Sequence, residues 1–210
     1  MIFLYIVTQL WSEFVGKLMR RVLLLLVTLS FASCADVSTE AQFPQLTYAH
    51  LGKFILDVSK IEIVNKFRSN YEAKTVEHMM PVSPAVAAYQ WAKDRLEPSG
   101  FSGRYAVFTI VDGTVSTKSL KREDGIKGAI KIEQSELFEA KILVRIEVFD
   151  SNDRRLAMTN AEALRFRSVS ENITLNERDK IWFTMSETLI SDLNKELESS
   201  IPKFLGQYIL

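Results

Sequence analysis

The chain has 210 residues, of which 47% are hydrophobic and 25% are charged, a composition typical of a globular protein with one domain. Its 26 basic residues balance its 26 acidic residues, so no net field attracts a nucleic-acid backbone, and we expect no nucleic-acid partner. The single cysteine excludes an intramolecular disulfide and a cysteine-rich zinc site.

The N-terminal region contains the pattern of a secretory signal, which starts at an internal methionine. Met19 is followed by two arginines, by the apolar run 22–31 and by small residues that precede Cys34. A basic start, a short apolar run and small residues before the cleavage point are the three parts of such a signal. The run is too short for a transmembrane helix, which needs about 20 apolar residues. We therefore predict a signal peptide over residues 1–33.

Residues 1–18 lengthen this signal without improving it, because they add the charged side chains of Glu13 and Lys17. The simplest interpretation is that translation starts at Met19. The alternative is that residues 2–11 form an interfacial or membrane segment of their own.

The four residues Phe31-Ala32-Ser33-Cys34 resemble the lipobox of bacterial lipoproteins, although Phe31 stands where leucine is usual. In those proteins the cysteine thiol is acylated, the signal is cut before the cysteine, and the new amino group is acylated as well. The resemblance implies that Cys34 is the lipidation site and that its lipid is the contact with the membrane, since several acyl chains bind a bilayer firmly. A buried free cysteine is the alternative.

The residues after the cysteine bear on which membrane holds the protein. Ala35 follows the cysteine directly, and Asp36 comes one residue later. In enteric bacteria an aspartate directly after the cysteine keeps a lipoprotein at the inner membrane. The resemblance therefore implies the periplasmic face of the outer membrane, with the inner membrane as the alternative. We assign residues 34–54 to the lipidated cysteine and its tether, and residues 55–210 to a single periplasmic domain.

The first half of this domain shows a strand and a helix. Residues 61–67 alternate between apolar and other side chains, which predicts a strand. A helix is predicted to begin after Ser83, a favourable N-cap, with Pro84 at its first position. The sequence Glu-Pro-Ser-Gly at 97–100 ends it.

Three long strands are predicted next. Residues 104–116 are apolar on both faces over much of their length, which indicates a central strand. Residues 136–150 alternate strictly, as expected for a half-exposed antiparallel strand, and residues 155–169 return as their hairpin partner after a polar turn. The charged, glycine-containing segment 121–135 is predicted to be a loop.

The chain ends with a long amphipathic helix. Thr174 and Glu177 have the spacing of a capping box, and Pro202 is expected to end or kink the helix. An apolar stripe at helical spacing comprises Trp182, Met185, Leu189, Leu193, Leu197 and Ile201. We predict an α+β fold in which two helices pack on one face of a four-stranded, mainly antiparallel sheet (β-α-β-β-β-α). The other face would be free for function.

Recognisable catalytic, cofactor and metal motifs are absent from the sequence. His50 and His78 are the only histidines, and a copper site at His78 with the two methionines after it would need further ligands to converge. Asp112 and Glu123 lie in or beside turns, where solvated carboxylates are the ordinary interpretation. We therefore predict no metal, no cofactor and no enzymatic activity.

Two arginines form the remaining candidate for binding. Arg165 and Arg167 lie on the same side of a predicted strand, so together they could contact an anionic lipid or an anionic partner. A solvated sheet face is the ordinary interpretation of such a pair.

Residues 65–100 resemble a stretch of uncharacterised lipoproteins from alphaproteobacteria, in which a pattern close to PNVEH-x-FP-x-x-P precedes a tryptophan-bearing helix that ends in DRL. The matching positions are Val76, Glu77, His78, Pro81, Pro84, Trp91, Asp94, Arg95 and Leu96. The likeness extends over most of residues 60–201 and implies a lipoprotein without an assigned activity. More loosely, the order of elements is similar to the auxiliary lipoproteins of ABC-type lipid transport systems, which implies an envelope protein or a transporter as partner.

We therefore expect a lipid-anchored envelope lipoprotein that is not an enzyme and that binds a protein or lipid partner in transport or envelope assembly. The alternative is a periplasmic enzyme or a small-ligand-binding protein. That alternative predicts a closed pocket in which polar side chains converge, around His78 in particular.

Overall fold

The computed structural model describes residues 43–71, 74–120, 134–170 and 172–210. The predicted signal peptide, Cys34 and most of the predicted loop 121–135 lie outside these residues. The folded unit begins at Phe43, and Tyr48, shortly after it, is buried.

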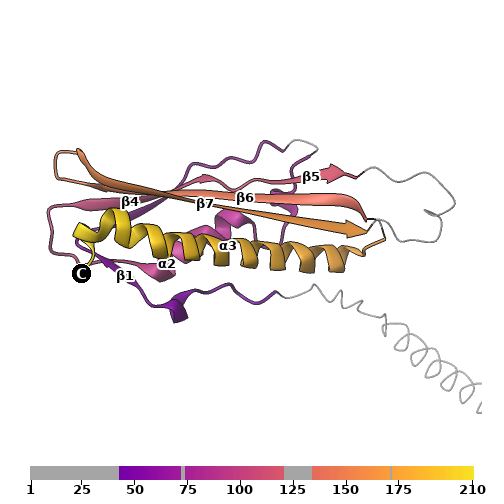
Figure 1. Cartoon of the computed structure of the whole chain (residues 1–210), viewed down its shortest axis with the longest axis horizontal. Coiled ribbons are helices and arrows are strands. Elements are labelled where there is room, and N and C mark those ends of the chain that lie inside the picture. Colours follow the sequence, from indigo (N-terminus) through magenta and orange to yellow (C-terminus); the bar gives the residue numbers. More distant parts are fainter. Residues whose placement is uncertain (1–42, 72–73, 121–133, 171) are drawn as a thin grey trace, which may run out of the picture. The chain divides into compact units, whose positions relative to one another are not determined.

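The sixteen-residue strand β6 (Gln134–Phe149) is the centre of the main sheet (Figure 1). Along one edge it pairs over its whole length with β7 (Arg155–Ser170) in antiparallel orientation. Along the other edge it pairs with β5 (Val115–Ser119) and β4 (Tyr105–Asp112), also antiparallel, and these two follow one another along that edge. β2 (Ile61–Asn65) extends the sheet beyond β4 and runs parallel to it.

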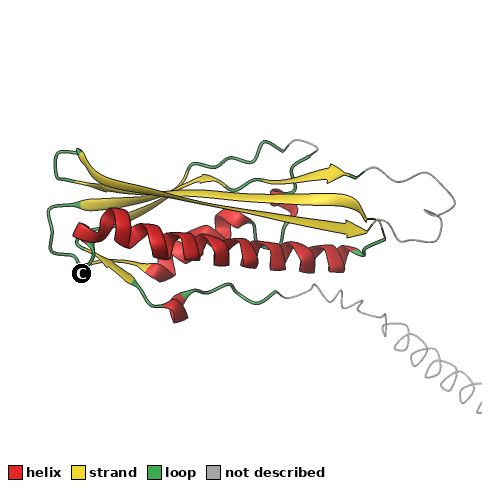
Figure 2. Cartoon of the chain, viewed as in Figure 1, coloured by secondary structure: helices red, strands yellow, loops and turns green. Residues whose placement is uncertain are grey.

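Two helices cover one face of this sheet, as the sequence predicts (Figure 2). α2 (Pro84–Arg95) contacts β2, β4 and β6, whereas α3 (Leu175–Leu205) contacts β6 and β7. Both helices begin at their predicted caps. The Ser83 hydroxyl accepts a backbone N–H of the first turn at 3.4 Å, and Thr174 and Glu177 form a capping box.

The number of strands differs from the prediction, because the main sheet has five and not four. The single strand predicted over 104–116 is divided at Gly113 into β4 and β5. The Asp112 carboxylate accepts the backbone N–H of Thr114 at 3.1 Å and the Thr114 hydroxyl at 2.6 Å, which closes a turn. A Cβ at Gly113 would lie 3.1 Å from the Cβ of Ala85, so the close approach of α2 also favours glycine at this position.

α3 buries every residue of its predicted apolar stripe, and these side chains form the core together with the inward side chains of the sheet. The helix does not end at Pro202 but continues to Leu205. Pro202 lies in the last turn, so its missing N–H removes only one hydrogen bond close to the end of the helix. Among the described residues, no helix combines the length and the apolar character that a membrane span requires.

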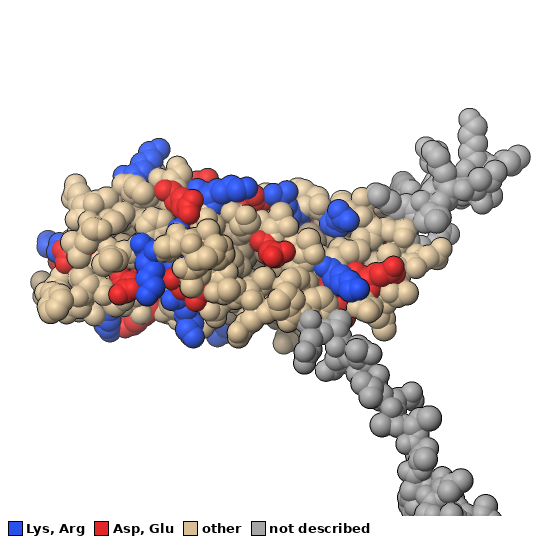
Figure 3. All heavy atoms as spheres, turned by 90° about the horizontal axis from the view of Figure 1, so that it is seen from below, with Lys and Arg blue, Asp and Glu red and all other residues tan. Residues whose placement is uncertain are grey.

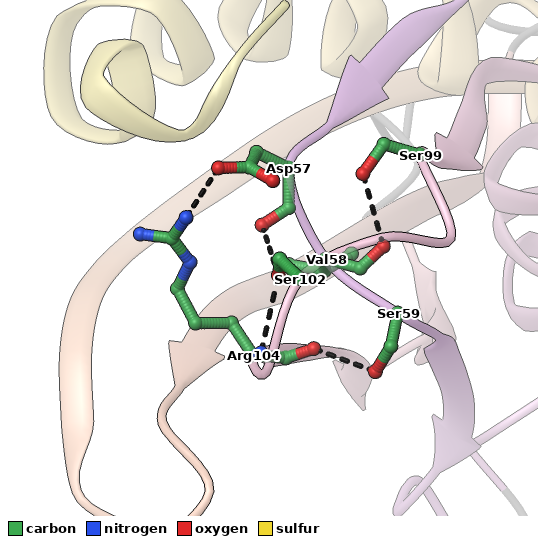
Figure 4. A network of polar contacts seen from close by, with 6 residues as sticks. All are labelled: Asp57, Val58, Ser59, Ser99, Ser102 and Arg104. Carbon is green, nitrogen blue, oxygen red and sulfur yellow. Dashed lines mark hydrogen bonds and ion pairs between the residues drawn. The ribbon is translucent and has the colours of Figure 1, made fainter.

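A small parallel sheet and a polar network join the first residues of the folded unit to the main sheet. β1 (Phe54–Leu56) pairs with β3 (Leu96–Pro98) in a sheet that is not predicted from the sequence. Directly after β1, the Asp57 carboxylate forms an ion pair with Arg104, and the Asp57 carbonyl accepts a hydrogen bond from the Ser102 hydroxyl at 2.8 Å (Figure 4). These contacts fix the turn that leads from β1 into β2.

Candidate functional site

The sequence-predicted candidates do not come together in one site. Cys34 and Glu123 lie outside the described residues. His50 and His78 are exposed in separate 3-10 turns, and the ring centroid of His78 lies 5.0 Å from that of Tyr71. Across the described ranges, no group of three or more His, Cys, Asp or Glu side chains is placed to hold a metal ion.

Glu77, next to His78, is a buried residue with structural contacts. Its side chain is 3% exposed, and the carboxylate accepts the Ser69 hydroxyl and, at 3.3 Å, the backbone N–H of Val115. The backbone N–H of Val76 donates to the Val115 carbonyl at 2.8 Å. Glu77 therefore ties the segment before α2 to the start of β5.

Asp94 and Arg95, at the end of α2, hold the segment 47–52 in place. The Asp94 carboxylate accepts the backbone N–H of Tyr48 at 2.8 Å. Arg95 is 3% exposed, donates to two backbone carbonyls of the segment and forms an ion pair with Glu198 of α3 at 2.9 Å. Several residues that carry the resemblance described above thus have structural partners within the fold.

A groove between β7 and α3 gathers basic side chains. We call it the β7–α3 groove, and its volume is about 300 Å³. Its lining residues are Arg165, Phe166 and Arg167 from β7 and Lys180, Ile181, Thr184, Met185 and Thr188 from α3. A volume of this size is at the lower end of those found for ligand pockets.

The alternation of β7 explains why the groove opens at this end of the strand. The side chains of Ala161 and Ala163 face α3 and are buried, because their small size lets the helix pack closely. Residues two apart on a strand share a face, so Arg165 and Arg167 also point toward α3. Long cationic side chains replace alanines there, and they line the groove. From the sequence, the ordinary interpretation is that the two arginines lie on the free, solvated sheet face. In the structure they lie on the opposite face, beside α3.

The groove opens away from α2. Ile181, Thr184 and Thr188 follow one another at helical spacing beside the buried stripe of α3. Arg165, which lies at the edge of the sheet, forms an ion pair with Asp192 on this same flank of the helix. α2 packs over β2 and β4, on the other side of β6 from β7. The flank of α3 that carries Asp192 therefore faces away from α2, toward the outer edge of β7.

Positive charge exceeds negative charge in the groove. Asp192 is shared between Arg165 and Lys195, the latter at 3.2 Å. Within the described ranges, Arg167 and Lys180 are exposed and form no ion pair, and the buried Nε of Arg165 has no hydrogen-bond partner. The arrangement can therefore bind an anionic group, with Ile181 and Met185 providing apolar contact beside it.

On the free face of the sheet, by contrast, Lys141 and Arg155 are paired with carboxylates, whereas Arg145 donates to the neutral side chain of Asn160 at 3.0 Å. The Lys141 ammonium nitrogen lies 3.2 Å from a Glu162 carboxylate oxygen and 3.5 Å from an Asp112 carboxylate oxygen. The pKa of Lys141 is raised, mainly by the hydrogen bond to Glu162. Arg155 pairs with Glu147 at 2.8 Å. On the helix side, Figure 3 shows basic and acidic side chains dispersed among other residues on the described part of that face.

A second cavity lies between α2 and the start of the folded unit, with a volume of about 380 Å³. Its lining comprises Phe43, Pro44, Gln45, Leu46, Pro81, Val82, Val86, Ala87 and Gln90. None of these residues is charged, and His78 lines neither this cavity nor the β7–α3 groove.

No family model and no curated protein sequence matches the chain. Among solved structures, a minor lipoprotein from Acinetobacter baumannii is similar with a TM-score of 0.35 and 10% sequence identity, over 68% of this chain and 89% of that one. Lipoprotein GNA1162 from Neisseria meningitidis has a TM-score of 0.22 and 8% identity, over 63% and 98%. A DUF330 protein from Xanthomonas campestris has a TM-score of 0.23 and 10% identity, over 70% and 90%. Scores this low assign neither a fold family nor a function to this chain.

Proposed function

We propose that this protein is a lipid-anchored lipoprotein of the bacterial envelope, held at the membrane by acylated Cys34, and that it binds a partner without catalysing a reaction. The partner belongs to a transport or envelope-assembly system and presents an anionic group to the β7–α3 groove. The periplasmic face of the outer membrane is the proposed location, with the inner membrane as the alternative.

The observation that carries this proposal is the unpaired charge of the groove. Arg167 and Lys180 have no ion-pair partner among the described residues, whereas Lys141 and Arg155 on the free sheet face are paired with carboxylates. Cationic side chains that converge without a carboxylate favour an anion from outside, and charge-assisted hydrogen bonds to it are the stronger kind.

The position of Cys34 supports a role close to the membrane. The folded unit begins at Phe43, nine residues after Cys34. A fully extended chain spans at most about 3.6 Å per residue, so the connection reaches no further than about 30 Å. An acylated Cys34 would therefore keep the domain beside the membrane surface, within reach of membrane-bound partners.

The anchor is tested by mass spectrometry of the mature N-terminus in wild-type and Cys34→Ala proteins. We expect a lipid-modified peptide that begins at Cys34 and is missing from the variant. Fractionation of the two membranes then decides between the outer and the inner location. An unmodified N-terminus at Met1 would contradict the proposed anchor.

Anion binding is tested by titrating the purified protein with inorganic phosphate and with a short-chain, soluble phosphatidylglycerol. The amide signals of groove residues report binding in NMR spectra. We expect the affinity to fall at least fivefold in Arg167→Gln/Lys180→Gln and to remain unchanged in Lys93→Gln, which removes an exposed cation of α2. Equal affinity in all three proteins would contradict anion binding in the groove.

A further inference from the structure

β7 is a sixteen-residue strand with one open edge. It pairs with β6 along its whole length, and no strand of the described residues pairs with its other side. An edge strand presents a row of backbone N–H and C=O groups that can accept one more strand. Peptide-binding domains use this property when an extended segment adds to a sheet and places alternate side chains in pockets.

The β7–α3 groove reaches this open edge. Three consecutive residues of β7, Arg165 to Arg167, line it. The Phe166 side chain points to the opposite face from the two arginines, and β7 is the outermost strand, so we infer that the groove extends to the open edge. A segment added to β7 would therefore lie along the groove, with α3 on one side.

The charges in the groove select the kind of segment. Arg165 and Arg167 are charged residues that point toward the helix side of an edge strand, which disfavours pairing with an apolar strand. Arg167 and Lys180, which have no ion-pair partner among the described residues, would pair instead with carboxylates on the added segment. Because residues two apart on a strand are separated by about 6.6 Å, acidic residues at alternate positions would match the two arginines.

The opposite face of β7 favours contact with apolar side chains. Leu164 and Phe166 are 48% and 59% exposed on the sheet face away from the helices. The intervening side chains of an added segment would lie on this face, where apolar groups would cover both residues.

Building on the function proposed above, we propose that the partner is a protein and that one of its extended segments adds to β7 as a further strand. Acidic residues of that segment alternate with apolar residues. The acidic side chains occupy the β7–α3 groove beside Arg167 and Lys180, and the apolar ones cover Leu164 and Phe166.

The test uses a fluorescently labelled, acetylated seven-residue peptide that alternates glutamate and valine, added to the purified full lipoprotein. Fluorescence anisotropy gives the affinity. Two further peptides carry N-methyl groups on either the odd or the even residues. In an added strand only alternate N–H groups face the sheet, so we expect one methylated peptide to lose at least tenfold in affinity and the other to bind nearly as well as the parent.

Side-chain variants then locate the contact. We expect Arg167→Gln/Lys180→Gln to weaken binding of the parent peptide at least tenfold and Lys93→Gln to leave it unchanged. Leu164→Ser/Phe166→Ser should weaken the valine peptide severalfold but not a peptide that alternates glutamate and serine.

The outcomes separate this inference from the function on which it rests. Equal effects of the two methylation patterns would overturn strand addition. Loss of peptide binding together with retained, Arg167-dependent binding of soluble phosphatidylglycerol would identify a lipid partner and overturn the protein partner, while anion binding in the groove would stand. If neither peptide, phosphate nor lipid bound, the proposed function would fail as well.

Discussion

Trp91 of α2 donates its indole N–H to the side-chain oxygen of Asn194 on α3 at 2.9 Å, inside the core between the two helices. Trp91 is fully buried and also stacks on Phe108 of β4, with 5.9 Å between the ring centroids. This hydrogen bond helps to fix how the two helices lie against each other, since a buried indole N–H needs a partner.

Replacing Asn194 with leucine should lower the free energy of unfolding by about 1–3 kcal/mol, because the Trp91 N–H would remain buried without an acceptor. Urea unfolding measures the change. Adding Trp91→Phe to Asn194→Leu removes the donor as well, so the two substitutions together should cost less than the sum of their separate effects. Strictly additive effects would show that the hydrogen bond contributes nothing.

Glu77→Ala should also destabilise the fold by about 1–3 kcal/mol, because the Val115 N–H would lose a charged acceptor. The exposed Glu196→Ala is the matched control and should change stability by less than about 0.5 kcal/mol. Hydrogen exchange provides a local measurement, since the Val115 amide should exchange faster in Glu77→Ala only. Unchanged protection of this amide would show that Glu77 does not hold β5.

A contact between β4 and the turn of the β6–β7 hairpin should make the stability of the fold depend on pH. The Tyr105 hydroxyl donates to the Asp153 carboxylate at 2.7 Å, and this hydrogen bond raises the pKa of Tyr105 from 10.0 to about 12. Because the pKa of Tyr105 is raised in the folded state, the stabilisation of the fold by the Tyr105–Asp153 hydrogen bond is complete below pH 10. It is lost as the pH rises through 12 and Tyr105 ionises.

Asp153→Asn should bring the pKa of Tyr105 back toward 10.0, since the neutral amide is a weaker acceptor. Asparagine also tolerates the positive φ of 59° at this position, so the turn is retained. Ultraviolet titration of tyrosine ionisation measures the shift. The same titration curve for both proteins would show that Asp153 does not control Tyr105.

Local sequence signals predict the helices and the hairpin well. The caps at Ser83 and Thr174 are confirmed because capping depends on neighbours within one turn. The break at Gly113 is missed although Asp112 and Gly113 are turn-forming residues, because the apolar stretch 105–111 and Val115 favour one strand across them. What divides them is the Asp112 turn and the approach of Ala85, and the second of these is visible only in three dimensions.

The candidate site shows the same limit. Alternation places Arg165 and Arg167 on one side of β7, but periodicity does not say which side faces a helix. That becomes clear when Arg165 is found paired with Asp192 of α3. Lys180 could not be grouped with the arginines, because the contact between β7 and α3 depends on the fold. The role of Glu77 likewise depends on a strand far along the chain.

The pairing of β6 with β7 also bears on the order in which the chain folds. One short turn brings these strands together, whereas β2 reaches β4 only after the chain has passed through α2. Closing a longer loop loses more chain entropy before stabilising contacts can form. The β6–β7 hairpin should therefore form early and the parallel β2–β4 pair late. Substitutions in the turn around Asp153 would then slow folding, whereas substitutions in β2 would mainly speed unfolding.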